Sequence, residues 1–355
     1  MKARAIAFYL PQYHPIPEND EFWGKGFTEW SNVAKAKPLF SGHCQPFLPS
    51  DLGFYDLRVP EVRQQQALLA EQAGIEGFCY WHYWFGNGKR ALERIFDEVL
   101  STGEPTLPFC LGWANESWTG KWHGLHNEII FKQEYPGEDD HKQHFFSLLP
   151  AFKDSRYIQV DGKPIFLIYR PHLIPDFARF QNLWETLSRE NGLDGIYWIS
   201  NGSLDAQETL DLGINGFAKN NLSEIIDYSQ NKYFRKLRYF YSRITSRRRP
   251  SILDYKHYVE YSKTIQLHEN EFPVLYPNWD STPRLGLNGY VLLNSNPSLF
   301  ADLLEHTISK IAHKPFQQRI IFLKSWNEWA EGNVLEPSMI FGRSYLDECS
   351  RVLLG

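Results

Sequence analysis

Residues 319–333, RIIFLKSWNEWAEGN, join an apolar run directly to a polar, tryptophan-rich segment. The run Arg319–Lys324 lacks polar alternation, which is typical of a strand buried on both faces of a parallel sheet. Two glutamates, Glu328 and Glu331, follow where this strand ends. Two tryptophans and an asparagine flank them: Trp326, Trp329 and Asn327. The segment predicts a strand that presents functional side chains at its carboxyl end.

Seven further apolar runs predict strands: Arg4–Leu10, Ile75–Trp81, Pro108–Gly112, Pro164–Tyr169, Gly195–Ser200, Gly213–Ala218 and Phe272–Tyr276. Apolar residues at helical spacing predict helices at Pro60–Ala73, Ala91–Thr102, Asp176–Asn191 and Ser298–His313. Eight strands separated by helices predict an α/β protein, a (β/α)8 TIM barrel in a single domain over residues 1–355. An open doubly wound sheet is the alternative, but no strand is followed by a glycine-rich phosphate loop.

Polar and aromatic residues accumulate after the predicted strands, where barrel enzymes build their sites. We expect these residues to bind substrate: Tyr13, His14, Trp81, His82, Tyr83, Trp84, Trp113, Asn115, Glu116, Trp118, Tyr169, Arg170, Asn278, Trp279, Asp280, Arg284 and Glu336, together with Trp30, Trp326, Asn327 and Trp329. Indole and phenol rings stack on sugar rings, and asparagine both donates and accepts hydrogen bonds to hydroxyls. The pattern indicates a carbohydrate site.

The spacing of Glu328 and Glu331 suits acid–base chemistry on a glycosidic bond. Residues three apart on a helical turn face one side, and close carboxyls favour a retaining reaction over an inverting one. The alternative is a helix N-terminus stabilised by acidic residues. Glu116 is either a further site carboxylate or the ion-pair partner of Lys121 or Arg170.

Asp280 is expected to bind a hydroxyl, with Arg284 as its partner. Glu336 is expected to hold the loop of the eighth strand in place.

Two segments depart from the barrel pattern. Residues 15–53 form a long loop after the first strand, rich in proline and aromatic residues. A basic aromatic insertion spans about 228–262, and its segment Lys232–Arg249 has eight Lys or Arg and no Asp or Glu. Three roles are open for that segment. It contacts an anionic membrane surface, or it forms a groove for an anionic glycan or lipid diphosphate. The third role is a solvated helix that packs on the barrel.

Composition narrows the class of protein. Hydrophobic residues make up 43% and charged residues 22%, which suits a globular core, while aromatic residues reach 16%. The net charge of −5 argues against nucleic-acid binding. Cys44, Cys79, Cys110 and Cys349 have no metal-ligand spacing, so we expect free thiols in a reducing compartment, and neither a metal nor a cofactor. No signal peptide is evident, which predicts a cytoplasmic protein, peripheral on the inner membrane if the basic segment binds there.

Several long motifs resemble the WbsX-type glycosyltransferases of bacterial O-antigen and other surface-polysaccharide clusters. They are AIAFYLPQYHPIPEND and FWGKGFTEW near the start, GFCYWHYWF, GWANESWTGKW, PNWDSTPR, and SWNEWAEGNVLEP near the end. The family is similar in turn to glycoside hydrolase family 99, the endo-α-mannosidases. The resemblance implies a (β/α)8 barrel and retaining glycosyl transfer in lipopolysaccharide-type synthesis. The implied substrate is an oligosaccharide or polysaccharide, either free or linked to a lipid.

The resemblance also implies roles for the two carboxylates. Glu328 would deprotonate the 2-hydroxyl of the sugar, whose oxygen attacks the anomeric carbon. Glu331 would be the general acid and then the general base. Ala330 stands where the hydrolases have histidine, which leaves the sugar undetermined. Two alternatives stay open: a cytoplasmic retaining endo-α-glycosidase and a non-catalytic glycan-binding protein.

Overall fold

The predicted strands form one parallel sheet. The computed structural model describes residues 1–119, 129–202, 206–219, 222, 225 and 249–355. The strands of the sheet are β1 (Arg4–Tyr9), β2 (Ile75–Trp84), β4 (Phe109–Trp113), β8 (Lys163–Ile168), β9 (Tyr197–Ser200), β10 (Gly216–Phe217), β12 (Val274–Leu275) and β14 (Ile320–Leu323). They pair in the order β10-β9-β8-β4-β2-β1-β14-β12. Each lies within one of the eight apolar runs or overlaps it, so these strand predictions are confirmed.

The sheet closes into a barrel. The first and last strands pair in parallel, with Arg4 opposite Ile320. At the other seam, Phe217 of β10 forms a parallel bridge with Glu271, just before β12. The amide of Phe217 donates to the carbonyl of Asn270 at 3.0 Å, and the amide of Phe272 donates to the carbonyl of Phe217 at 2.8 Å. Closure confirms the (β/α)8 barrel and excludes the open sheet, because a closed barrel has no free edge.

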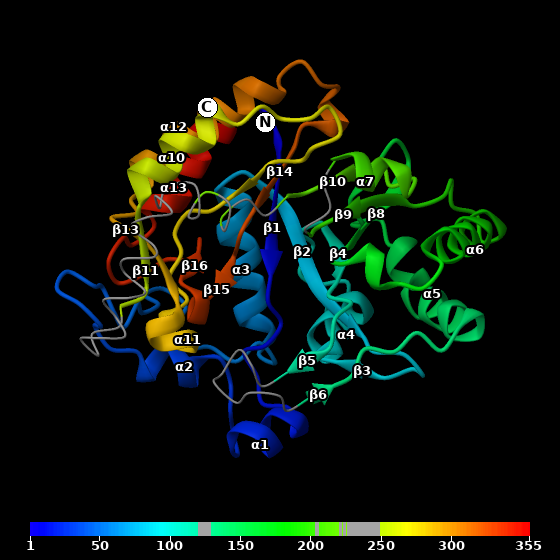
Figure 1. The fold of residues 1–355 in the computed structure, drawn as a ribbon, viewed down its shortest axis with the longest axis horizontal. Helices are drawn as coiled ribbons and strands as arrows, with labels where there is room; N and C mark the ends of the chain where they lie inside the picture. The colour runs from blue at the N-terminus through cyan, green and yellow to red at the C-terminus, as the bar shows by residue number, and fades with distance from the viewer. Residues whose placement is uncertain (120–128, 203–205, 220–221, 223–224, 226–248) are drawn as a thin grey trace, which may run out of the picture.

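A helix follows each strand of the barrel before the next one begins. The helices are α3 (Pro60–Gln72), α4 (Glu93–Thr102), α5 (Glu138–Phe152), α6 (Phe177–Glu190), α7 (Ala206–Asp211), α10 (Tyr255–Thr264), α12 (Pro297–Ile311) and α13 (Ser344–Leu353). The four predicted helices correspond to α3, α4, α6 and α12. Figure 1 shows α10, α12 and α13 lying together beside β14, with the two chain ends close to each other. The amide of Lys2 donates to the carbonyl of Leu353 at 3.0 Å.

Smaller elements lie around the barrel, several of them at the carboxyl ends of its strands. The 15–53 loop holds α1 (Pro17–Trp23) and α2 (Trp30–Lys35), and α11 (Thr282–Leu285) follows β12. Short strands are β3 (Arg90–Ala91), β5 (Trp118–Thr119), β6 (Ile129–Phe131), β7 (Gln159–Val160), β11 (Ser251–Asp254), β13 (Tyr290–Leu293), β15 (Asn327–Glu328) and β16 (Asn333–Val334). Figure 1 shows α2, α11, β5 and β6 at the same end of the barrel.

The predicted basic insertion falls mostly outside the described residues. Of the segment Lys232–Arg249, only Arg249 is described, and it is exposed. The later part of the 228–262 range forms β11 and most of α10, which packs on the barrel through Tyr255 and Tyr258. That part is therefore barrel scaffold. Within the portion of the chain that the structure describes, no helix is both long and apolar enough to cross a bilayer.

Candidate active site

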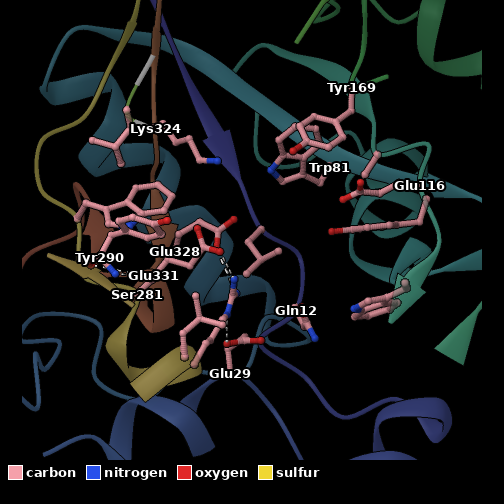
Figure 2. Close-up of a pocket in the computed structure, with 18 of the residues that line it drawn as sticks. Gln12, Glu29, Trp81, Glu116, Tyr169, Ser281, Tyr290, Lys324, Glu328 and Glu331 are labelled. Carbon is pink, nitrogen blue, oxygen red and sulfur yellow. Dashed lines mark hydrogen bonds and ion pairs between the residues drawn. The ribbon is translucent and has the colours of Figure 1, made fainter. Parts of the chain in front are cut away.

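A cavity of about 360 Å³ opens at the carboxyl ends of the strands. Figure 2 shows Glu328 and Glu331 on one side of it, across from Trp81, Tyr169 and Glu116 on the other. Nine of the predicted site residues line it: Trp81, Tyr83, Glu116, Trp118, Tyr169, Trp279, Arg284, Glu328 and Glu331. They come from β2, β4, β8, β12 and β14 or the loops that follow these strands, as a barrel site requires.

One arginine gathers three glutamates in this cavity, and we call Glu29, Arg284, Glu328 and Glu331 the carboxylate cluster. The guanidinium donates from Nε to Glu29 at 3.0 Å, from Nη1 to Glu331 at 2.5 Å and from Nη2 to Glu328 at 3.2 Å. The glutamates come from the 15–53 loop and from the loop after β14, which are far apart in the sequence. Both predicted catalytic carboxyls thus bind adjacent nitrogens of one side chain and lie beside each other (Figure 2).

The loop after β14 is fixed at several points before it reaches the carboxylates. The side chain of Asn327 accepts from the amide of Leu10 at 2.8 Å and donates to its carbonyl at 3.0 Å. The hydroxyl of Ser325 accepts from the amide of Glu328 at 3.1 Å. Residues Asn327–Glu328 pair with β16 in an antiparallel hairpin. These bonds join the start and the end of the barrel and hold the glutamates rigidly.

Burial and the like charge of Glu331 determine the pKa of Glu328. Burial, reinforced by the charge of Glu331, raises the pKa of Glu328 to about 7, although Arg284 opposes the rise. Burial disfavours the charged form of Arg284, but its three carboxylate partners more than offset this and hold its pKa well above the ordinary value. Glu328 therefore exchanges its proton near neutral pH, in the range where a carboxyl group can act as either an acid or a base.

Flat aromatic faces form the walls. Trp81 stacks on Phe8 inside the barrel with ring centroids 5.1 Å apart and an angle of 7° between planes. Tyr83 stacks on Trp118 at 5.7 Å and 15°. Because these rings are held from behind, they offer fixed platforms for a sugar ring at low entropic cost. Tyr169 meets Trp81 edge-on at 6.1 Å and completes that wall.

The chain is similar in sequence to a known protein family. The family model for glycosyltransferase WbsX matches residues 5–349. The chain belongs to the WbsX glycosyltransferase family. Two relatives, each called uncharacterized protein WxcX, from two strains of Xanthomonas campestris pv. campestris, are 35% identical over 363 residues. The alignment covers 99% of this chain and 50% of each relative, so the chain spans about half their length.

Solved structures confirm the architecture of this WbsX family member. The GH99 endo-alpha-mannosidase from Bacteroides thetaiotaomicron superimposes with a TM-score of 0.57 at 17% identity, covering 99% of this chain and 96% of that one. A glycoside hydrolase-like protein gives 0.60 at 14% identity, covering 99% and 94%. At such identities the likeness concerns the fold. The family model is that of a glycosyltransferase, so glycosyl transfer is the class of activity that the family indicates.

Glu116 lines the cavity and also forms an ion pair. Its carboxylate accepts from Nε of Arg170 at 2.8 Å, which agrees with the ion-pair alternative. Asn115 is buried and holds the backbone of Arg170, accepting from its amide at 2.7 Å and donating to its carbonyl at 2.8 Å. Arg170 therefore orients Glu116 from outside the cavity lining, and Asn115 fixes the loop beneath both.

Many predicted contacts are buried behind the cavity lining, where they support its walls. They are Tyr13, His14, Trp30, His82, Trp84, Trp113, Asn115, Asn278, Trp326, Asn327, Trp329 and Glu336. Tyr13, for instance, accepts from the amide of Trp329 at 2.9 Å, and Asn278 accepts from the amide of Val334 at 2.7 Å. The placement of these residues does not match direct substrate contact. The high aromatic content therefore serves the core as well as the cavity.

His82 was expected to donate to a sugar hydroxyl, but its ring faces His144, with Nε2 atoms 2.8 Å apart. Burial lowers the pKa of His82 to about 3, so the ring is neutral. His14 is likewise buried, and burial lowers its pKa to about 4. Among the described residues, no group of three or more His, Cys, Asp or Glu side chains is placed to hold a metal ion.

Asp280 differs from its predicted role. It accepts from Nε2 of His43 at 2.7 Å and from Nε2 of Gln45 at 2.6 Å. Nδ1 of His43 accepts a backbone amide, so its Nε2 carries the proton. Asp280 thus anchors the 15–53 loop, and the partners of Arg284 are glutamates instead. The reason is its position, because Asp280 lines a second cavity of about 180 Å³ together with His43 and Gln45, whereas Arg284 lines the first.

Glu336 holds the loop after β14, as expected. It accepts from Trp329 at 2.6 Å, Tyr55 at 2.9 Å and Gln66 at 2.6 Å. Burial raises its pKa to about 7, although these hydrogen bonds oppose the rise. Its role in the structure is to fix Trp329, one of the two residues between the catalytic candidates.

Several lining residues are absent from the predicted set. The polar ones are Gln12, Glu29, Ser117, Ser281, Tyr290 and Lys324. Gln12 and Lys324 follow β1 and β14 directly, so their strand-end positions were a usable signal. Glu29 had none, because it lies within a 39-residue loop stretch whose path the sequence does not define.

Proposed function

We propose that this protein is a retaining glycosyl-transferring enzyme of bacterial surface-polysaccharide synthesis, of the O-antigen or lipopolysaccharide type. The observation that carries the proposal is the carboxylate cluster, in which Glu328 and Glu331 share Arg284 on the floor of an aromatic-walled cavity. Membership of a glycosyltransferase family supports transfer as the reaction. The substrate is an oligosaccharide or polysaccharide, and Trp81 and Trp118 are its stacking platforms.

The reaction uses two proton transfers at each step. Glu328 takes the proton of the sugar 2-hydroxyl, and that oxygen attacks the anomeric carbon to form a 1,2-anhydro sugar. Glu331 gives its proton to the departing oxygen as the old glycosidic bond breaks. In the second step the acceptor hydroxyl loses its proton to Glu331 and attacks the anomeric carbon, and Glu328 returns its proton to O2. Two inversions retain the configuration.

The first step needs a proton distribution that differs from the one that burial favours in the protein. Burial favours the proton on Glu328, whereas the first step needs it on Glu331. Because both carboxyls bind neighbouring nitrogens of Arg284, the proposal includes transfer of this proton within the pair when a substrate enters. Leaving-group dependence tests the assignment: an aryl glycoside with an acidic phenol should restore the first step in Glu331→Gln but not in Glu328→Gln.

The decisive experiment compares wild type with Glu331→Gln. Purified protein is incubated with lipid-linked oligosaccharide and nucleotide sugars, and separately with α-mannosides. The proposal expects chain extension by the wild type, loss of turnover in the variant and unchanged binding of oligosaccharide. Release of reducing ends without extension would show the endo-glycosidase instead. A cellular polysaccharide phenotype unaffected by Glu331→Gln would show a glycan-binding protein and overturn catalysis altogether.

The location of the enzyme is a separate part of the proposal. A lipid-linked substrate and the basic composition of Lys232–Arg249 support action on the cytoplasmic side, at the surface of the inner membrane. Charge reversal of Arg247, Arg248 and Arg249 tests this. Binding to vesicles of phosphatidylglycerol should fall while turnover of a water-soluble substrate stays. Unchanged vesicle binding would contradict membrane contact.

A further inference from the structure

Lys324 stands apart from the other charged residues of the cavity. Its ammonium lies 5.3 Å from the ring centroid of Trp279. Its side chain lines the cavity but makes no ion pair or hydrogen bond to any residue in the described part of the chain. Each of the other charged side chains of the cavity has an ion-pair partner, because Arg284 binds three glutamates and Glu116 binds Arg170. The ammonium group therefore has N–H donors without a hydrogen-bond acceptor in the described part of the chain, and the ring of Trp279 lies beside it.

We propose that Lys324 and Trp279 form a subsite for an anionic group of the substrate, either a phosphate of an activated donor or the carboxylate of a uronic acid residue. The proposal rests on the proposed function and specifies its substrate class. A lysine ammonium binds phosphate and carboxylate as a compact positive charge.

The layout of charges allows an anion at this position. Figure 2 shows Lys324 on the opposite side of the cavity from Glu116. All three glutamates of the carboxylate cluster, including Glu328, are bonded to Arg284, which reduces their repulsion of a bound anion. For a phosphate donor, the bond between the anomeric carbon and the bridging oxygen breaks, and its electron pair stays on the phosphate. Lys324 would stabilise that developing charge.

The simpler role for Lys324 is to change the pKa of Glu328. Its positive charge lowers the pKa of Glu328 against the effect of burial. Under that role alone, Lys324→Met would shift the pH profile of turnover and would leave the choice between charged and neutral ligands unchanged. Binding measurements separate the two roles because they do not require turnover.

The test measures binding of three probes at pH 7.5 by calorimetry or ligand-observed NMR: inorganic pyrophosphate, mannuronic acid and mannose. We expect at least one anionic probe to bind wild type about tenfold or more tightly than mannose does. Lys324→Met should abolish that preference and change mannose binding less than about twofold, while Lys324→Arg should retain most of it. If pyrophosphate loses affinity in Lys324→Met, the anionic group is a phosphate of the donor. If mannuronic acid loses affinity, it is the carboxylate of a uronic acid residue.

Two controls make the outcome decisive. Lys256 has a side chain 67% exposed and lies outside the cavity lining, so Lys256→Met should leave all three affinities unchanged. The inference is overturned if neither anion binds wild type better than mannose, or if the preference survives in Lys324→Met. If the anion subsite is overturned in this way while Glu331→Gln abolishes turnover, the proposed function stands. If Glu331→Gln retains turnover, the proposed function itself has failed.

Discussion

Glu328 should destabilise the native protein at neutral and alkaline pH. In the unfolded chain a glutamate ionises near its ordinary pKa of 4.5, whereas in the cavity Glu328 keeps its proton to about 7. Between these values the native state binds more protons than the unfolded state, so the free energy of unfolding falls as the pH rises. A difference of this size corresponds to about 3 kcal/mol once the pH exceeds 7.

Glu328→Gln removes that penalty, because the amide resembles the protonated carboxyl. We expect the variant to be more stable than wild type at pH 8, by as much as about 3 kcal/mol, with the advantage disappearing toward pH 4.5. Urea unfolding across this pH range measures it. Arg284 keeps Glu29 and Glu331 as partners in the variant.

Glu331→Gln is the matched comparison and should change stability in the opposite direction. It removes the charge from the 2.5 Å bond to Arg284, and loss of a charge-assisted hydrogen bond costs about 1.5–3 kcal/mol. Both substitutions should abolish turnover. If Glu328→Gln is no more stable than wild type at pH 8, or if its advantage is the same at pH 5, the reasoning about the buried carboxyl is refuted.

Three further predictions concern the supporting structure. Arg284→Gln leaves buried carboxylates without their cation and should lower the free energy of unfolding by roughly 3–5 kcal/mol, whereas Arg343→Gln breaks an exposed pair and should cost at most about 1 kcal/mol. Urea unfolding compares them, and equal losses would contradict the assignment. Asn327→Ala leaves both backbone groups of Leu10 unpaired and should cost about 2–4 kcal/mol by the same measurement, while no loss would show that water replaces the bonds. Trp81→Ala should weaken oligosaccharide binding up to about tenfold by calorimetry, and unchanged affinity would remove it as a platform.

The barrel was predictable because each strand is a short apolar run that needs burial on both faces. Helix α5 (Glu138–Phe152) was not predicted, since its buried face includes Asp140, His141 and His144 and so lacks a continuous apolar stripe. In the site, Glu328 and Glu331 could be predicted from their position after β14. Glu29 could not, because its contact with Arg284 joins residues 255 positions apart through an irregular loop.

Aromatic residues mark the limit of such prediction most clearly. Trp81 and Trp84 lie three positions apart in one strand, yet one lines the cavity and the other is buried with its indole donating to Asp140 at 3.2 Å. Strand alternation predicts that their faces differ, but only the packing of α5 decides which face is inside. Asp280 illustrates the same limit, since its partners His43 and Gln45 come from a loop more than 230 residues away.

The seam between β1 and β14 has a consequence for synthesis of the chain. The loop that carries Glu328 and Glu331 is anchored by Asn327 to Leu10, so a ribosome must add 317 residues after Leu10 before that contact can exist. A nascent or truncated product that stops before β14 has neither the last barrel strand nor the two glutamates. Enzymatic turnover would therefore report that the whole ring has been completed.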